Sequence, residues 1–248
     1  MIVTIQIPKC ASTSAKTIFQ KRFRGEWSGV VGNTAEQAAD MFFSEVERRK
    51  DTPFNRPIRA ISGHMPYGIH QYIDGYIESS VEYVVTSRNP LDRVISLWKF
   101  TYGKYSNHRL SLTEWLEVIG SAAHNVLTRY MSGKAVDNSW VGDSNLFNQV
   151  EPVMIEPLLS EDLTTATENI DRCSVVGVVD RFLTFQQTIE NRYNLPNVPE
   201  YILNSFQDSP ATAAIENYVP TSREINRILE LNDMDVVLHN YIANEVAP

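Results

Sequence analysis

The first residues that could do chemistry follow the first hydrophobic run of the chain. Lys9 comes directly after the segment MIVTIQIP, and the hydroxyl residues Ser12, Thr13 and Ser14 come at the cap of a helical pattern. Backbone N–H groups at the start of a helix have no partners inside it, and the helix dipole adds partial positive charge. A lysine and hydroxyl groups beside them would complete a site for a phosphate or sulfate group. The stretch therefore predicts an anion site.

An ordinary structural explanation of the same stretch stays open. A lysine after a strand is usually a surface lysine, and serines before a helix are usually caps. The stretch also lacks the glycines of the G-x-x-x-x-G-K-[ST] loop that binds nucleotide phosphates. On this stretch alone the structural explanation is the stronger one, so the anion site needs support from elsewhere in the chain.

A second candidate site comes after the clearest buried strand pattern, residues 81–86. Arg88 follows this strand, and the helix after it carries Ser96 about two turns from its start. Ligands of open α/β sheets bind at the carboxyl ends of strands, and an arginine fork with a hydroxyl group suits a phosphate dianion. The alternative is that the arginine pairs with Asp92 and the serine packs inside the helix. By themselves these residues favour neither explanation.

The elements that must position these residues alternate between strands and helices. The predicted strands are residues 2–7, 58–62, 81–86 and 173–179. The predicted helices are a segment from Ala15 onward, residues 34–50, 67–76, 90–103, 111–119, 122–131, 151–169 with a break at Pro157, 182–192, and one or two helices over 221–244. Such alternation implies crossover connections and a mostly parallel sheet. We therefore predict an α/β fold in a single domain, residues 1–248.

The composition is that of an ordinary globular protein and argues against several classes. The net charge of −8 disfavours broad nucleic-acid binding, which depends on a basic surface. Cys10 and Cys173 allow at most one disulfide, and no metal-ligand cluster is evident, so no metal is expected. No secretory signal or membrane-spanning run is visible, which predicts a cytoplasmic protein. A sequence trimmed of a Golgi-type anchor would give the same pattern.

Taken together, the two candidate sites resemble those of one enzyme family. Residues 7–14, IPKCASTS, resemble the 5′-phosphosulfate loop of sulfotransferases that use 3′-phosphoadenosine 5′-phosphosulfate (PAPS), which commonly reads I-P-K-x-A/G-[ST]-[ST]-[ST]. Residues 88–96, RNPLDRVIS, resemble the 3′-phosphate motif of the same family, R-[DN]-P-x-[DE]-R-x-x-S. Both motifs occur in the family's order, each after a strand. Within the family, the chain looks like the carbohydrate-type sulfotransferases, which include the heparan 2-O and 6-O enzymes.

Shorter matches extend the resemblance over most of the chain. Residues 62–65, SGHM, are similar to the G-H-x segment of the carbohydrate subgroup, in which the histidine is the expected base. Residues 125–133 and 176–182 resemble its N-x-x-T-R-x-L-x-G helix and its V-G-[LV]-x-[ED]-R-F turn, and the end of the chain from Pro220 also fits. The chain is short for that subgroup, and Cys10 stands where threonine is common. These departures concern the acceptor more than the nucleotide.

The resemblance implies a P-loop-like three-layer fold and sulfuryl transfer from PAPS to a hydroxyl acceptor, with a sugar or glycan expected. The product would be 3′-phosphoadenosine 5′-phosphate (PAP). The implied catalytic residues are Lys9 and His64, the latter as the base of an in-line displacement. The implied nucleotide-binding residues are Lys9, Cys10, Ala11, Ser12, Thr13, Ser14, Ala15, Arg88, Ser96, Thr221 and Ser222.

Other functions stay open at this stage. A P-loop kinase-like phosphotransferase is disfavoured because neither a glycine-rich loop nor a Mg²⁺-binding aspartate at a strand end is evident. A non-catalytic nucleotide- or glycan-binding module would keep both motifs, and His64 would then only satisfy hydrogen bonds at a strand end. The sequence leaves the acceptor and the oligomeric state open. We expect acceptor choice in the loops 103–110, 134–148 and 194–220.

Overall fold

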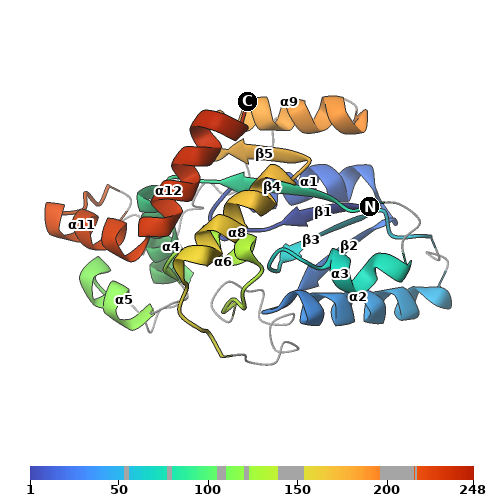
Figure 1. Cartoon of the computed structure of the whole chain (residues 1–248), viewed down its shortest axis with the longest axis horizontal. Coiled ribbons are helices and arrows are strands. Elements are labelled where there is room, and N and C mark those ends of the chain that lie inside the picture. The colour runs from blue at the N-terminus through green and yellow to red at the C-terminus, as the bar shows by residue number, and fades with distance from the viewer. Residues whose placement is uncertain are drawn as a thin grey trace.

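The computed structural model describes residues 1–52, 56–76, 80–104, 110–119, 123–138, 154–195, 215 and 217–248. Within these residues, the centre of the molecule is a sheet of five parallel strands in the order β2-β3-β1-β4-β5 (Figure 1). The strands are β1 (Ile2–Ile5), β2 (Trp27–Val31), β3 (Ala60–His64), β4 (Glu82–Ser87) and β5 (Val175–Val178).

β1 is central and buried on both faces, which explains its composition. Its residues IVTI are all buried, and β-branched side chains suit the two-sided packing of a parallel strand. Val3 pairs with Ile61 of β3 and with Tyr83 of β4, so the three strands are in level register. The predicted α/β fold with a mostly parallel sheet is therefore confirmed.

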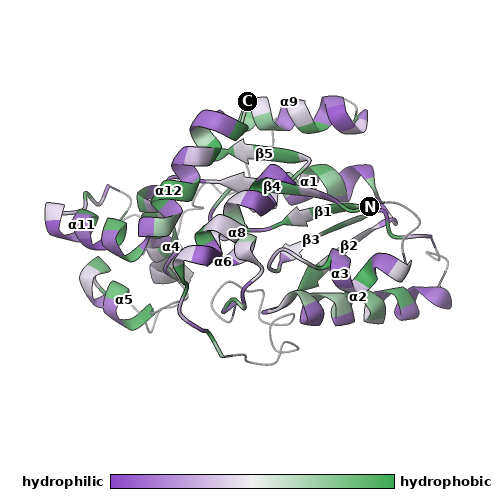
Figure 2. Ribbon diagram, viewed as in Figure 1, coloured by the Kyte–Doolittle hydropathy of each residue, from purple (hydrophilic) through white to green (hydrophobic). Residues whose placement is uncertain are grey.

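Helices cover both faces of the sheet and give the expected three layers. One layer consists of α1 (Ser12–Arg22) and α9 (Phe182–Tyr193). Phe19 and Phe185 of this layer pack in one core with Val84 of the sheet. The other layer contains α2 (Ala35–Lys50), α3 (His70–Ile73), α6 (Val126–Ser132), α8 (Ser160–Asp171) and α12 (Asp233–Tyr241). Figure 2 shows both hydrophobic and hydrophilic residues on α2 and α9, as expected of helices that cover a sheet with one side.

A third group of helices lies beyond the carboxyl ends of the strands (Figure 1). It consists of α4 (Pro90–Lys104), α5 (Leu112–Ile119) and α11 (Ser222–Leu231). Trp98, Trp115 and Ile228 belong to the hydrophobic core that these helices share. The remaining described elements are the short helical turns η1 (Asp74–Tyr76), η3 (Val179–Arg181) and the π-helix η4 (Ile242–Val246). None of the helices described here combines the length and the apolar character that crossing a membrane requires.

Two strands are shorter than predicted, since β1 ends at Ile5 rather than at residue 7 and β5 spans Val175–Val178 rather than residues 173–179. Two others differ more. β3 spans Ala60–His64 rather than residues 58–62, because its pairing with the neighbouring strands continues through its last residues. The prediction omits β2, whose sequence WSGVV does not alternate between hydrophobic and polar residues. Its Trp27 side chain lies over Gly29, where a Cβ atom would be 3.2 Å from the indole ring. The glycine that weakens the strand pattern therefore makes room for the tryptophan.

Two helices begin later than predicted. α6 begins at Val126 rather than at residue 122, because Asn125 adopts a left-handed backbone conformation with φ of 46°. α8 begins at Ser160 rather than at residue 151. Residues 154–159 form no regular structure, and residues 151–153 lie outside the described part of the chain. The other predicted helices are present, although the one predicted over 67–76 is reduced to α3 and η1.

Gly63 in β3 should tolerate no side chain. A methyl carbon at this position would overlap the carbonyl oxygen of Val30 in β2, so the two strands would have to separate. We expect Gly63→Ala to lower the free energy of unfolding by about 3 kcal/mol or more. Urea denaturation measures this, with Gly75→Ala as the matched control, because no atom lies within 4 Å of a Cβ at Gly75. Equal stability of the two variants would contradict this packing.

Candidate functional site

Three of the residues singled out by the sequence lie at one edge of the sheet. β3, β1 and β4 are parallel neighbours, so their carboxyl ends meet there. Lys9 follows β1, His64 ends β3 and Arg88 follows β4. From β1 the chain passes to β2 and β3 on one side and later to β4 and β5 on the other. Ligands of open α/β sheets bind at such a reversal of strand order, so this edge is the candidate site.

The loop between β1 and α1 has an unusual backbone. Lys9 and Ala11 adopt left-handed conformations, with φ of 65° and 53°, although neither is a glycine. Such a residue costs about 1–3 kcal/mol and persists only where its surroundings hold it. Ala11 is the N-cap of α1 and makes no side-chain hydrogen bond. The hydroxyl residues 12–14 therefore lie in the first turn of the helix, and the prediction that they cap it is wrong.

β4 supplies groups that hold this loop. The Thr86 hydroxyl donates to the carbonyl of Cys10 at 2.5 Å, and the Arg88 guanidinium donates to the carbonyl of Lys9 at 3.4 Å. Burial raises the pKa of the Cys10 thiol to about 12, and this cysteine is not in a disulfide with Cys173, although the sequence allowed one. The bond from Arg88 brings the two predicted anion motifs into contact.

Lys9 extends from this loop to α4. Its ammonium lies 4.5 Å from the ring centroid of Phe100. Burial of the amine and the positive charge of Arg88 lower the pKa of Lys9 to about 8. An anion bound beside the amine would raise this pKa again, because it favours the charged form. Lys9 is therefore a cation at neutral pH that an anionic ligand would stabilise.

Ser96 lies on the face of α4 that is turned toward Lys9. It stands one helical turn before Phe100, and residues four apart in a helix share a face. Ser96 and Arg88 are both half-buried, so neither is sealed in the core. The charge of Arg88 acts on Lys9 strongly enough to lower its pKa. Because Arg88 also donates to the carbonyl of Lys9, the two cationic residues are neighbours at the strand ends.

His64 is a neutral imidazole at the end of β3. Burial is the main cause that lowers the pKa of His64 to about 4, and the charge of Lys16 on α1 lowers it further. A hydrogen bond with the backbone of Gln6 acts in the opposite direction. At pH 7 the ring therefore has a lone pair that can accept a proton. Negative charge brought close to the ring would raise the pKa and strengthen the base.

Gln6, which was not among the predicted site residues, joins the histidine to the anion loop. This buried residue donates its backbone N–H to the carbonyl of Gly63 at 2.8 Å and its side-chain amide to the carbonyl of Ser12 at 3.2 Å. Its backbone also bonds the ring of His64. One residue therefore holds the end of β3 and the first turn of α1 together. A signal was present, because a buried polar side chain within a β-branched run needs a hydrogen-bonding partner.

A comparison with protein families bears on the motifs that meet at this edge. A model described as the sulfotransferase family matches residues 1–242. The chain belongs to the sulfotransferase family. Membership of this family supports sulfuryl transfer as the type of reaction. A comparison with curated proteins found no match.

Two solved sulfotransferase structures are similar to this sulfotransferase. The sulfotransferase from Alicyclobacillus acidocaldarius has 12% sequence identity and a TM-score of 0.42, over 93% of this chain and 94% of that chain. The mouse sulfotransferase SULT7A1, solved in complex with PAP, has 13% identity and a TM-score of 0.33, over 97% of this chain and 88% of that chain. Neither similarity identifies an acceptor for this sulfotransferase.

The segment after α6 closes over the ends of β2 and β3 in the sulfotransferase. Asn138 is fully buried, and its side-chain amide donates to the carbonyls of Gly32 at 3.0 Å and His64 at 3.1 Å. A tyrosine hydroxyl of α6 donates to the side-chain oxygen of Asn138. The loop predicted at 134–148 therefore contacts the backbone of His64 through Asn138, and its residues 139–148 lie outside the described part of the chain.

A buried polar network behind α4 supports the site. Arg93, which is 1% exposed, donates to the carbonyl of Ala123 at 2.7 Å and to the side chain of Asn232 at 3.0 Å. Asp235 is fully buried and accepts hydrogen bonds from two N–H groups in the first turn of α6, at 3.0 and 2.8 Å. Three sequence segments that resemble the family therefore meet in one network. Its members are structural supports that lie behind the strand-end residues.

Thr221 and Ser222 lie at the start of α11. The Thr221 hydroxyl donates to the carboxylate of Glu224 at 2.8 Å and accepts from the N–H of the same residue at 3.3 Å, which makes a capping box. Both residues are exposed. Their part in nucleotide binding stays a prediction.

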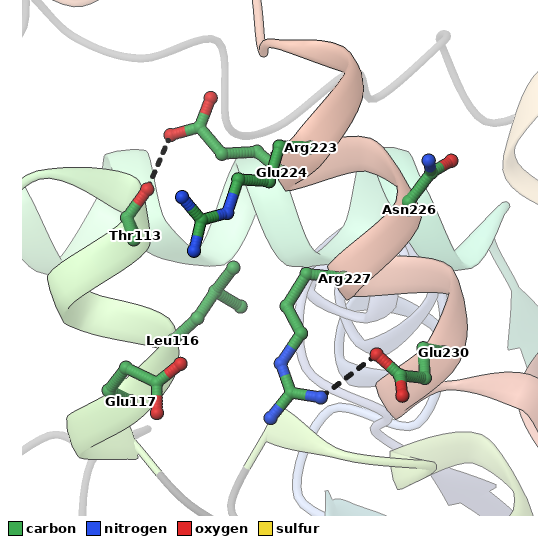
Figure 3. A pocket seen from close by; sticks show the side chains of 8 residues that line it. All are labelled: Thr113, Leu116, Glu117, Arg223, Glu224, Asn226, Arg227 and Glu230. Atoms are coloured by element: carbon green, nitrogen blue, oxygen red, sulfur yellow. Dashed lines mark hydrogen bonds and ion pairs between the residues drawn. The ribbon is translucent and has the colours of Figure 1, made fainter.

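Figure 3 shows a groove whose lining residues all come from α5 and α11 and not from the ends of the strands. It has a volume of about 570 Å³ and is lined by Thr113, Leu116, Glu117, Arg223, Glu224, Asn226, Arg227 and Glu230. Within it, the Thr113 hydroxyl donates to Glu224 at 3.1 Å, and Arg227 pairs with Glu230 at 2.9 Å. Two arginines and three glutamates line the groove, so their charges sum to −1. A ligand with several negative charges therefore suits the strand ends better than this groove.

The pKa of Lys9 should rise when Arg88 loses its charge. Arg88 disfavours the protonated amine, so Arg88→Gln should raise the pKa of Lys9 above about 8, while burial keeps it below the ordinary 10.5. NMR of protein labelled with ¹³C-lysine measures this pKa, and a Lys9→Met variant identifies the resonance. Arg22→Gln, on the exposed last turn of α1, is the matched control and should change nothing. An unchanged pKa in Arg88→Gln would show that the two cations are not neighbours.

Proposed function

We propose that the protein transfers the sulfuryl group of PAPS to a hydroxyl group of a carbohydrate and releases PAP. The observation that carries this proposal is the pair of cations, Lys9 and Arg88, that two adjacent strands bring to one site. PAPS has a phosphosulfate at the 5′ end and a phosphate at the 3′ end of one nucleoside. A protein that binds it therefore needs two separated anion sites, one for each end of the nucleotide.

Lys9 and the first turn of α1 would hold the 5′ end of the donor. The N–H groups of Ser14 and Ala15 already donate to the carbonyl of the N-cap residue, at 3.0 and 3.2 Å. The donors that the turn offers are therefore those of Ser12 and Thr13, strengthened by the helix dipole. When bound, PAPS supplies the sulfuryl group, and negative charge then develops on its 5′-phosphate oxygen. The ammonium of Lys9 would stabilise that charge.

Arg88 and Ser96 would hold the 3′-phosphate. A guanidinium has five N–H donors in a planar fork, and the bond from Arg88 to the carbonyl of Lys9 is long, at 3.4 Å. Ser96 adds a hydroxyl group from the facing helix. In the loop before α1, the Cys10 N–H already donates to the carbonyl of Ile7 at 3.2 Å and the thiol is buried, so Cys10 would only shape the loop. Ala11 would contribute its backbone N–H. A fork and a hydroxyl group together suit a phosphate dianion.

His64 would accept the proton of the acceptor hydroxyl group. Its imidazole is neutral at pH 7 and is held by the backbone of Gln6. His64 and Lys9 lie at the ends of the adjacent strands β3 and β1. The proposed base and the cation for the leaving oxygen would therefore act from the ends of adjacent strands. In-line displacement depends mainly on such positioning and on stabilisation of charge.

The carbohydrate acceptor is the most specific part of the proposal. It is supported by the likeness of residues 62–65 and 125–133 to segments of the carbohydrate-type sulfotransferases. The structure adds that Asn138, in the segment after α6, donates to the backbone carbonyl of His64 at 3.1 Å. The segment that leads into the predicted acceptor loop therefore contacts the backbone of the proposed base.

One experiment with two readouts tests the proposed function. In calorimetry, the wild type should bind PAP, and Arg88→Gln should bind it about tenfold more weakly or worse, since a charge-assisted contact to phosphate is lost. Arg22→Gln is the control and should bind PAP as the wild type does. Binding of ATP with Mg²⁺ but not of PAP would refute the proposal in favour of a kinase-like phosphotransferase.

The second readout is transfer of labelled sulfate from PAPS to a panel of sugars, glycans, phenols and alcohols. We expect transfer to carbohydrate hydroxyls, and His64→Ala should lower kcat about 100-fold or more while the affinity for PAP stays within about threefold. If the wild type and His64→Ala bind PAP but are equally inert on the whole panel, the protein is a binding module. Transfer to phenols alone would overturn the carbohydrate acceptor.

A further inference from the structure

The aromatic ring of Phe100 faces the ammonium of Lys9. The distance from Nζ to the ring centroid is 4.5 Å, and a ring face attracts a cation within about 6 Å. Phe100 is half-buried and stands one turn after Ser96 on the same face of α4. The ring therefore borders the proposed nucleotide site, although it has no polar group to offer a ligand.

The contact with Phe100 fixes the tip of the Lys9 side chain, while other contacts fix its backbone. The backbone of Lys9 is left-handed, with φ of 65°, and its carbonyl accepts a hydrogen bond from Arg88 at 3.4 Å. The long side chain is thus fixed at its base by a residue after β4 and at its tip by a residue of α4. A lysine held in this way loses less conformational freedom when it binds an anion than a freely rotating lysine loses.

The ring also acts on the charge of the amine. Burial and the nearby guanidinium of Arg88 both disfavour the protonated form of Lys9. The face of an aromatic ring carries negative potential, so it stabilises the ammonium relative to the neutral amine. Another aromatic residue of α4 points elsewhere, because the Trp98 indole donates to the carbonyl of Leu110 at 3.0 Å and packs 4.8 Å from the ring of Tyr218.

We propose that Phe100 is a positioning residue for sulfuryl transfer, whose ring holds the ammonium of Lys9 charged and in place before PAPS binds. The inference rests on the proposed function, because that function gives Lys9 the task of binding the 5′-phosphosulfate. Phe100 needs no contact with the reacting atoms, since it acts through Lys9.

Two substitutions of Phe100 distinguish the effect of the aromatic ring from the effect of an apolar side chain of similar size. Phe100→Leu keeps an apolar side chain but removes the ring, and Phe100→Tyr keeps the ring. Tyr102→Leu is the matched control, since Tyr102 lies on the same helix with its ring 5.9 Å from that of Trp98. In NMR titrations of labelled lysine, Phe100→Leu should lower the pKa of Lys9 by about 0.4 to 0.7 unit. Phe100→Tyr and Tyr102→Leu should leave it unchanged.

The affinity for PAP gives a second readout of the same contact. At pH 8, Phe100→Leu should raise the Kd of PAP about two- to fivefold, because fewer molecules carry a charged Lys9 and the side chain is less fixed. At pH 6.5 the loss should be smaller, since Lys9 is protonated in both proteins. A role in packing alone would give the same loss at both pH values and would overturn the inference.

The outcomes distinguish this inference from the function on which it rests. An equal pKa of Lys9 in the wild type and in Phe100→Leu would overturn the inference, whether or not the protein binds PAP. Tighter binding of PAP by Phe100→Leu would also overturn it, because the ring would then compete with the nucleotide for Lys9. If the pKa shifts as expected but the wild type binds no PAP, the proposed function fails, and the role in transfer fails with it.

Discussion

The parallel pairing of β1 with β3 on one side and β4 on the other is the constraint on which the site depends. Ile5 pairs with both Gly63 and Val85, so the three strands approach the same edge at nearly one level. Lys9 and Arg88, which follow β1 and β4, then share one small space. This is why positions 9, 64 and 88, far apart in sequence, lie at one edge of the sheet.

Two cations in that space repel each other, and the surrounding structure holds them there. The repulsion contributes to the lowered pKa of Lys9, and the loop keeps two residues in left-handed conformations. Hydrogen bonds from Thr86 and Arg88 fix the loop, and the buried bonds of Arg93 fix the helix that carries Ser96. Negative charge between the cations would remove the repulsion. This is the physical reason to regard the pair as an anion site and not as two unrelated surface charges.

The sequence was enough to predict the α/β fold and the position of Lys9 and Arg88 at one edge of the sheet, because parallel strands end at one edge and the motifs follow those strands. It was not enough where a residue owes its place to a distant partner. Gln6 matters through bonds to β3 and α1, and Phe100 through a loop ninety positions earlier. β2 was missed because Gly29, which breaks the strand pattern, makes room for Trp27. The left-handed conformation at Ala11 could not be predicted, because no glycine marks it in the sequence.

A crystal structure of the protein with PAP tests the central claim most directly. We predict one PAP molecule across the carboxyl ends of β1 and β4, with its 5′-phosphate within hydrogen-bond distance of Lys9 and the N–H groups of Ser12 and Thr13. Its 3′-phosphate should contact Arg88 and Ser96. PAP bound in the groove between α5 and α11, or at the sheet edge with its phosphates away from both cations, would contradict the claim.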